Sequence, residues 1–185
     1  MTEPPAIRGI ERNLARALTK AKTTLLLRYH RHRVNVLAGA PVNQVVWVDL
    51  AIGQLHTYSY NASGRLTSTI VRPGKPRGAS WNANSACGCA LDPFTDFGPQ
   101  LHASLLGVQT IDGKRTFHLR FTGTMQAGPF MIDFWIAPSN YLPLRLKWTL
   151  RVDRGNHQLS AAMTVTDQFV WLPRTSANVA RLGSG

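Results

Sequence analysis

The sequence predicts an α+β fold that is mainly β, with about nine or ten antiparallel strands and one N-terminal helix. Segments between Leu106 and Trp171 alternate apolar and polar residues with a period of two, which is typical of strands with one buried face. Turn-forming residues separate these segments, so successive hairpins are expected to form a meander. The chain shows no strand–helix–strand alternation, which makes a parallel α/β fold improbable.

The helix is expected over about residues 9–21, after a loose, Pro-containing lead-in over residues 1–8. Ile10, Leu14 and Leu18 recur at helical spacing, and charged residues occupy the other side. Such a helix could lie on a membrane surface, act as a lid, or pack over the open side of the sheet. We favour packing on the sheet because it buries the apolar side of both elements.

The sheet is expected over about residues 23–171. In its first half the strand Gln44–Leu50 is rich in Val and Trp, which predicts burial on both faces. Asn61-Ala62-Ser63 matches a glycosylation acceptor, but the same residues suit a hairpin turn, which we favour. The other strands expected in this half are Thr23–Val36, Leu55–Tyr60 and Arg65–Val71.

The second half of the sheet begins with a strand in His102–Ile111. Asp112-Gly113 is a hairpin dipeptide, and Pro138-Ser139-Asn140 and Arg154-Gly155-Asn156 are also turn sequences. After Pro173 the chain leaves the sheet, where Thr175 or Ser176 could cap a short terminal helix. The remaining expected strands are Arg115–Thr122, Phe130–Ile136, Leu144–Val152 and Leu159–Trp171.

An irregular segment over about residues 72–99 is the best candidate for a flap at the mouth of a cavity, because long connections are usually functional. It contains both cysteines, Cys87 and Cys89. A Cys-x-Cys disulfide, half of a metal site and a redox dithiol are three alternatives. We rank the disulfide first because a covalent link would order this irregular loop.

Charge is the unusual feature of the composition: 21 Lys and Arg face 9 Asp and Glu, so the formal net charge is +12. A basic excess favours anionic partners such as phospholipid headgroups, nucleic acid or acidic polymers. Nucleic acid is disfavoured, since the chain has none of the common nucleic-acid-binding patterns. The cations expected to face an anion or a membrane are Arg28, Arg31, Arg33, Arg72, Lys75, Arg77, Arg145, Lys147 and Arg151.

Sequence motifs of catalysis and cofactor binding are missing from the chain, and no nucleophile–base set can be assembled by spacing, so an enzyme is disfavoured. His30 and His32 share a strand face, but no Cys or carboxylate lies nearby and the Arg neighbours oppose a cation, so no metal is predicted. No other cofactor is predicted. Asp49, Asp133 and Asp167 lie in or next to strands, where burial against Arg or backbone partners is expected. Asp167 stands out because it lies on the apolar parity of its strand.

Three motifs of the meander resemble those of a known family. Gly107–Gly113 followed by Thr116–Arg120 is similar to the G-x-x-x-x-D-G … Y-x-L hairpin of LolA-like proteins. Phe134–Pro138 leading to Tyr141–Arg145 resembles their W-[ILV]-D-x-x-x-x-L-P-[LV]-[KR] turn, with Ala137 in place of the usual acidic residue. Thr166–Pro173 resembles the T-D-[FY]-x-W-L-P exit strand of exported actinobacterial members. The shared order of elements covers about Ile10–Pro173, and the Cys-x-Cys loop is a departure from the carriers.

This resemblance implies a curved, incomplete barrel whose apolar concave side is covered by the N-terminal helix and holds acyl chains. The superfamily includes lipoprotein carriers, lipid-binding lipoproteins of the LppX and LprG type, and RseB-type sensor domains of anti-sigma-factor regulators. The expected function is therefore non-enzymatic binding of a lipid or lipidated protein. The residues expected to line the groove are Leu25, Leu27, Trp47, Phe117, Leu119, Phe121, Phe134, Leu146 and Trp148.

Two other functions follow from the sequence and the resemblance. The first is an envelope stress sensor that contacts a regulatory protein, and the second is a redox or hydrolytic enzyme that uses Cys87 and Cys89. An extracytoplasmic location is expected if a targeting or anchor segment has been removed, and a cytoplasmic one if not. The chain itself shows neither a signal peptide nor a run of about 20 apolar residues.

Overall fold

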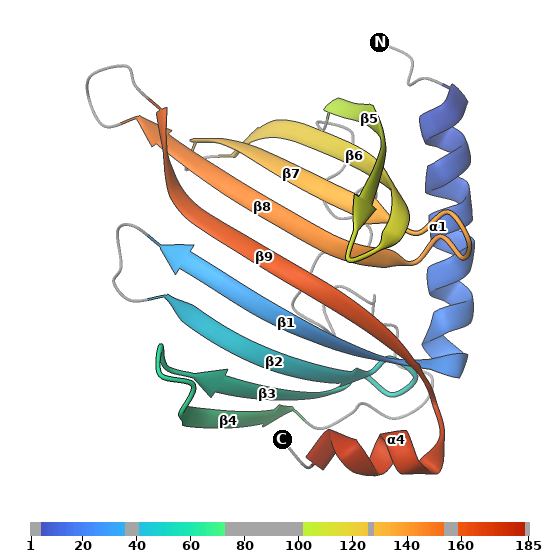
Figure 1. Ribbon diagram of the computed structural model, residues 1–185, viewed down its shortest axis with the longest axis vertical. Helices are drawn as coiled ribbons and strands as arrows, with labels where there is room; N and C mark the ends of the chain where they lie inside the picture. Colours follow the sequence, from blue (N-terminus) through green and yellow to red (C-terminus); the bar gives the residue numbers. More distant parts are fainter. Residues whose placement is uncertain (1–4, 36–40, 73–101, 126–127, 154–158, 184–185) are drawn as a thin grey trace.

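The computed structural model describes residues 5–35, 41–72, 102–125, 128–153 and 159–183 (Figure 1). These residues form one N-terminal helix, a sheet of nine antiparallel strands and a short C-terminal helix, which confirms the predicted fold class. The elements are α1 (Pro5–Thr24), β1 (Leu25–Asn35), β2 (Val42–Asp49), β3 (Gln54–Tyr60), β4 (Leu66–Arg72), β5 (His102–Ile111), β6 (Lys114–Met125), β7 (Gly128–Ile136), β8 (Pro143–Asp153), β9 (Leu159–Pro173), α4 (Ser176–Ala180) and the 3₁₀ turn η2 (Arg181–Gly183).

Helix α1 begins four residues earlier than the sequence predicts, at Pro5, and ends at Thr24. Proline is tolerated in the first helical turn because its missing N–H has no partner there in any case. The extra turn buries Ile7, which is 1% exposed. The expectation of a loose lead-in over residues 1–8 is therefore wrong for residues 5–8. None of the helices in the described part of the chain is long and apolar enough to cross a membrane.

The sheet order is β4-β3-β2-β1-β9-β8-β7-β6-β5. The first strand of the chain pairs with the last, and β4 and β5 form the two open edges (Figure 1). The β5–β6 hairpin turns at Asp112 and Gly113, whose φ angles are 49° and 74°. Positive φ at both central residues is what this class of hairpin turn requires, so the dipeptide has the predicted role.

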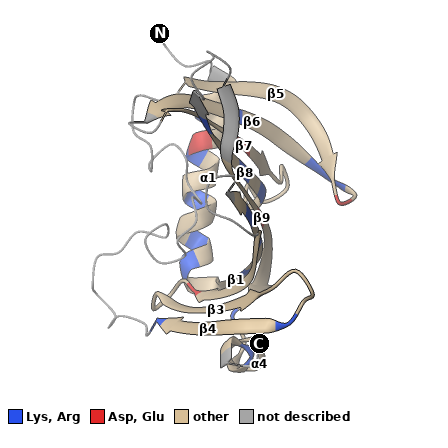
Figure 2. Ribbon diagram, turned by 90° about the vertical axis from the view of Figure 1, so that its left-hand side faces the viewer, with Lys and Arg blue, Asp and Glu red and all other residues tan. Residues whose placement is uncertain are grey.

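The main core lies between α1 and one face of the sheet, which we call the concave face. Figure 2 shows α1 on the hollow side of the curved sheet. Ile10, Leu14, Leu18 and Ala21 of α1 are buried there, as their helical spacing predicts, and Ile7 from the additional first turn is buried with them. The helix therefore covers the apolar side of the sheet. The buried strand residues of this core are Leu27, Tyr29, Val46, Val48, Leu55, Leu119, Phe121, Phe130, Ile132, Phe134, Ile136, Leu146 and Phe169.

A smaller core lies on the opposite face, which we call the convex face. Trp47 of β2 and Tyr58 of β3 pack there with Leu182 of η2, and the Tyr58 hydroxyl donates to the Leu182 carbonyl oxygen at 2.9 Å. The Thr175 side chain caps α4 by accepting from the Asn178 backbone N–H, as the sequence predicts. The C-terminal segment thereby covers the second side of β2, which explains why that strand is apolar on both faces.

Each of the three strand aspartates is buried and has an arginine partner, which confirms the prediction. Asp49 accepts from Arg174 at 2.7 Å, and Asp167 accepts from Arg31 at 2.7 Å. Asp133 accepts from Arg120 at 2.8 Å and lies 2.9 Å from Nε2 of His118. A carboxylate removed from water needs such partners, because an uncompensated charge in the interior is costly.

Asp133→Asn is expected to flatten the loss of stability in acid. Burial alone would raise the pKa of the Asp133 carboxyl, but hydrogen bonds from Arg120 and His118 outweigh it and lower the pKa below its ordinary value of 3.8. A lowered folded-state pKa means that the ionised group stabilises the protein above about pH 4, and that this stability is lost as the pH falls through the folded-state pKa. Urea unfolding between about pH 5 and pH 2 should therefore show a shallower decline in the variant.

The control for that measurement is Asp112→Asn, which changes an exposed aspartate in a turn where asparagine adopts the same backbone conformation. As the pH falls, the stability of Asp112→Asn should decline more nearly like that of the wild type than the stability of Asp133→Asn does. Equal slopes for Asp133→Asn and the wild type would contradict the assignment of acid sensitivity to the Asp133 cluster.

Candidate functional site

The concave face is the candidate site because the sheet brings eight of the nine predicted groove residues together on it. The register sets Phe134 of β7 between Leu119 of β6 and Leu146 of β8, so three strands contribute to one apolar row. A second row runs through Phe121, Ile132 and Trp148. The eight residues that share this face are Leu25, Leu27, Phe117, Leu119, Phe121, Phe134, Leu146 and Trp148.

Trp47 does not belong to this site, and its prediction as a groove residue is wrong. It packs on the convex face with Tyr58 and Leu182, and the Arg28 guanidinium lies 5.3 Å from its ring centroid. The sequence could not show on which face of the strand Trp47 lies. Val45 and Trp47 point to one face and Val46 and Val48 to the other, and all four residues are apolar. Trp47 lies on the convex face because η2 covers that side of β2.

The apolar residues of the concave face differ in how far they are covered. Leu27, Leu119 and Phe134 are fully buried, whereas other large side chains of the face are only partly buried. The partly buried group supplies the apolar surface that a ligand could still contact. It comprises Leu25, Phe117, Trp148, Leu150 and Trp171.

Trp148 carries an unusual polar atom within this apolar face. Its indole Nε1 is inaccessible to solvent and has no hydrogen-bond partner among the described residues. A buried donor without an acceptor costs about 1–3 kcal/mol.

Arg31 and Asp167 form a charged pair within the concave face. Nε and Nη2 of Arg31 donate to the two carboxylate oxygens of Asp167 at 2.8 and 2.7 Å, and the guanidinium lies 5.2 Å from the Tyr29 ring centroid. Burial would lower the pKa of Arg31, but the hydrogen bonds to Asp167 raise it. The expectation that Arg31 faces an external anion is corrected, because an internal carboxylate already holds its guanidinium. The same pair explains why Asp167 lies on an apolar parity.

The other predicted cations are divided between the two faces and the edges of the sheet. Arg28 and Arg145 lie on the convex face over Trp47 and Trp135, at 5.3 and 5.6 Å from the ring centroids. The exposed cations are Arg33, Arg72, Lys147 and Arg151. Lys75 and Arg77 lie outside the described residues.

His30 and His32 share the convex face of β1, as predicted. Nδ1 of His32 lies 2.7 Å from Oδ1 of Asn43. The described part of the chain contains no group of three His, Cys, Asp or Glu side chains that could hold a metal ion. Cys87 and Cys89, and all of the predicted flap except Arg72, lie outside the described residues.

Sequence comparisons match no known protein family and no curated protein. Among solved structures, the lipoprotein LppX of Mycobacterium tuberculosis is 11% identical with a TM-score of 0.52, over 89% of this chain and 96% of LppX. MucB is 14% identical with a TM-score of 0.54, over 95% of this chain and 62% of MucB. MucB in complex with MucA(peri) is 17% identical with a TM-score of 0.51, over 95% of this chain and 60% of that chain.

The chain thus spans most of LppX but only about three fifths of the MucB chains. These identities are too low to carry an activity, but the similarity covers 89–95% of this chain. The predicted architecture is confirmed at the level of fold alone: the chain shares its fold with LppX and MucB.

Proposed function

We propose that the concave face binds the acyl chain of a lipid or of a lipidated protein, without catalysis, in the cell envelope. The observation that supports this most directly is the continuous apolar surface that β1, β9, β8, β7 and β6 present under a single helix. Burial of each methylene against such a surface contributes about 0.8 kcal/mol, so a chain of ordinary length needs few polar contacts.

The charged groups of the structure also favour binding over catalysis. Asp49, Asp133 and Asp167 are each held by an arginine, and such pairing leaves none of the three as a free general base. The name of LppX, a lipoprotein with the same fold, fits a role in the envelope. The membrane surface is a further expected partner, through the exposed cations Arg33, Lys147 and Arg151.

Leu150→Glu is expected to weaken the uptake of a fluorescent fatty acid at least tenfold. Leu150 is partly buried against the concave core, so the substitution places a charge on the surface that would receive the acyl chain, where desolvation is costly. Fluorescence titration of the purified protein measures the affinity, and native mass spectrometry of protein from a lipid-containing host detects co-purified lipid.

The matched control is Val170→Glu, which introduces the same charge on the convex face, where Val170 is 41% exposed. It should bind the fatty acid as the wild type does. Circular dichroism of both variants checks that the sheet is intact. Absence of both uptake and co-purified lipid in the wild type, or equal affinities in the two variants, would refute lipid binding at the concave face.

A regulatory protein partner is a second candidate function, supported by the open sheet edges. Leu66, Ile70 and Val71 of β4 are about half exposed, as are Leu106 and Val108 of β5. Exposed apolar edge strands are suited to pairing with a strand of another chain. The complex of MucB with MucA(peri) is an example of a protein with this fold bound to a protein partner.

A further inference from the structure

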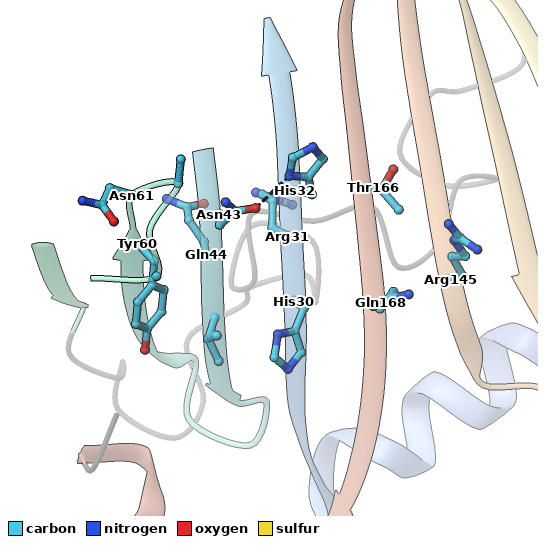
Figure 3. A pocket seen from close by; sticks show the side chains of 13 residues that line it. His30, Arg31, His32, Asn43, Gln44, Tyr60, Asn61, Arg145, Thr166 and Gln168 are labelled. Atoms are coloured by element: carbon cyan, nitrogen blue, oxygen red, sulfur yellow. Dashed lines mark hydrogen bonds between the residues drawn. The ribbon is translucent and has the colours of Figure 1, made fainter. Parts of the chain in front are cut away.

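A pocket of about 520 Å³ opens on the convex face, on the side of the sheet away from α1. Figure 3 shows its lining side chains on adjacent strands, with Asn43 and Gln44 on β2, His30 and His32 on β1, Thr166 and Gln168 on β9 and Arg145 on β8. Tyr60 and the β3–β4 turn form its other side. We call this the convex pocket, and it shares no apolar side chain with the concave core.

The sheet register creates the pocket from residues that are distant in the sequence. His30 pairs with Gln168, which in turn pairs with Arg145, so these three side chains form one row across β1, β9 and β8. His32 and Thr166 form part of the next row. All five carry groups that can donate a hydrogen bond. One side of the pocket is thus formed by hydrogen-bond donors that are held on adjacent strands.

The pocket has cations but no anion among the described residues that line it. Its two arginines are Arg31 and Arg145, and none of the thirteen lining residues is Asp or Glu. The guanidinium of Arg31 is already held by Asp167. The carboxylate of Asp133 on β7 is already held by Arg120 and His118. Nε of Arg145 is buried and has no acceptor among the described residues. Among the described residues, Arg145 thus has no carboxylate partner and no acceptor for Nε.

Trp135 holds the Arg145 side chain in place. The guanidinium lies 5.6 Å from the centroid of the Trp135 ring, and the indole N–H of Trp135 donates to Gln109 at 3.0 Å. The ring is also stacked on His118, with centroids 4.5 Å apart. A guanidinium fixed on an aromatic ring loses little conformational entropy when it binds a planar or tetrahedral oxyanion.

We propose that the convex pocket binds the phosphate group of a small molecule or of a lipid headgroup, with Arg145, Thr166 and Gln168 as its donors. A phosphate accepts hydrogen bonds from several directions and supplies the negative charge that the pocket lacks. The volume exceeds that of a lone phosphate and leaves room for a polar carrier such as glycerol or a sugar, within the usual range of about 300–1,000 Å³ for ligand sites. This site is separate from the acyl-binding surface of the concave face.

The first test follows the ring signals of His30 and His32 by NMR while inorganic phosphate or glycerol phosphate is added at constant ionic strength. We expect saturable shifts in the wild type and at least tenfold weaker binding in Arg145→Gln. The control is Arg151→Gln, which removes the same charge from an exposed position of the same strand outside the pocket and should leave the affinity unchanged. Absence of saturable shifts, or equal losses in the two variants, would overturn the proposal.

Arg145→Gln removes packing contacts as well as the charge, so a second variant is needed that leaves the packing intact. Thr166→Val keeps the shape of the side chain but deletes the hydroxyl donor, so phosphate affinity should fall several-fold while the fold is retained. An unchanged affinity in Thr166→Val likewise counts against the site.

Vesicles distinguish the two sources of phosphate. Co-sedimentation with vesicles that contain phosphatidylglycerol, reduced in Arg145→Gln relative to Arg151→Gln, assigns the pocket to a lipid headgroup. Saturable binding of glycerol phosphate with no such difference on vesicles assigns it to a soluble phosphorylated compound. Either result leaves the acyl-binding proposal untouched, because that proposal is tested by fatty-acid uptake at the concave face.

Discussion

Phe134→Ala is expected to lower the free energy of unfolding by about 3–5 kcal/mol. Phe134 is fully buried on the concave face, between Leu119 and Leu146 on the neighbouring strands. Removal of the ring loses its transfer free energy and leaves a cavity, because two strands on each side and α1 above prevent the site from collapsing. Urea denaturation followed by circular dichroism measures the loss.

The control is Val170→Ala, at an exposed position on the other face, which should cost less than about 0.5 kcal/mol. A loss below about 1 kcal/mol for Phe134→Ala would mean that the ring is not tightly packed, contrary to the structure. A fatty acid that restores part of the lost stability would place its acyl chain in the new cavity, since a ligand that binds only the folded state raises stability.

Asp167→Ala is expected to destabilise the protein by about 3 kcal/mol. Asp167 is 1% exposed, and its loss removes the carboxylate to which Nε and Nη2 of Arg31 donate. Part of the cost is the penalty of a largely buried Arg31 charge that has lost this carboxylate, and part is the net strength of the pair. Chemical denaturation at neutral pH measures the effect.

The double variant Arg31→Met/Asp167→Leu separates these two contributions. It removes both charges and keeps apolar volume on β1 and β9, so its stability should return to within about 1–2 kcal/mol of the wild type. A double variant as unstable as Asp167→Ala would show that the pair itself, and not the charge of Arg31 that remains in the single variant, supports the register between the first and last strands.

Together these predictions connect stability with the proposed function. The fully buried residues of the concave face, such as Phe134, maintain the curved sheet, whereas the partly buried ones, such as Leu150, are available to a ligand. Substitutions in the first group should therefore change the free energy of unfolding more than the affinity. Substitutions in the second group should do the reverse.

Much of this architecture could be read from local patterns. The alternation in Arg115–Thr122, and that of Leu146, Trp148 and Leu150 within Leu144–Val152, sorted side chains correctly into two faces, because a regular strand has a period of two. Asp112-Gly113 marked its hairpin because few residues adopt positive φ at low cost. The three strand aspartates needed buried partners for a reason independent of the fold, namely the cost of desolvating a charge.

The convex pocket illustrates what those patterns leave open. His30, Gln168 and Arg145 stand in one row only because β1 pairs with β9 and β9 with β8. Each residue by itself reads as part of an ordinary polar strand face, and no short motif links them. The only local signals were the basic composition of β1 and the two histidines on one parity, which indicated an anion without giving a site.

By itself the sequence determined the fold class, the two faces of most strands, the main turns and the need of Asp167 for a partner, since these depend on local geometry and on the solvation of single residues. Only the tertiary structure decided which arginine meets Asp167, which side of β2 holds Trp47 and where the donors converge. The physical reason is that a strand's period fixes parity, whereas the neighbours across a sheet are selected by burial over the whole chain: Arg31 and Asp167 are 136 residues apart and become adjacent only when the first strand pairs with the last.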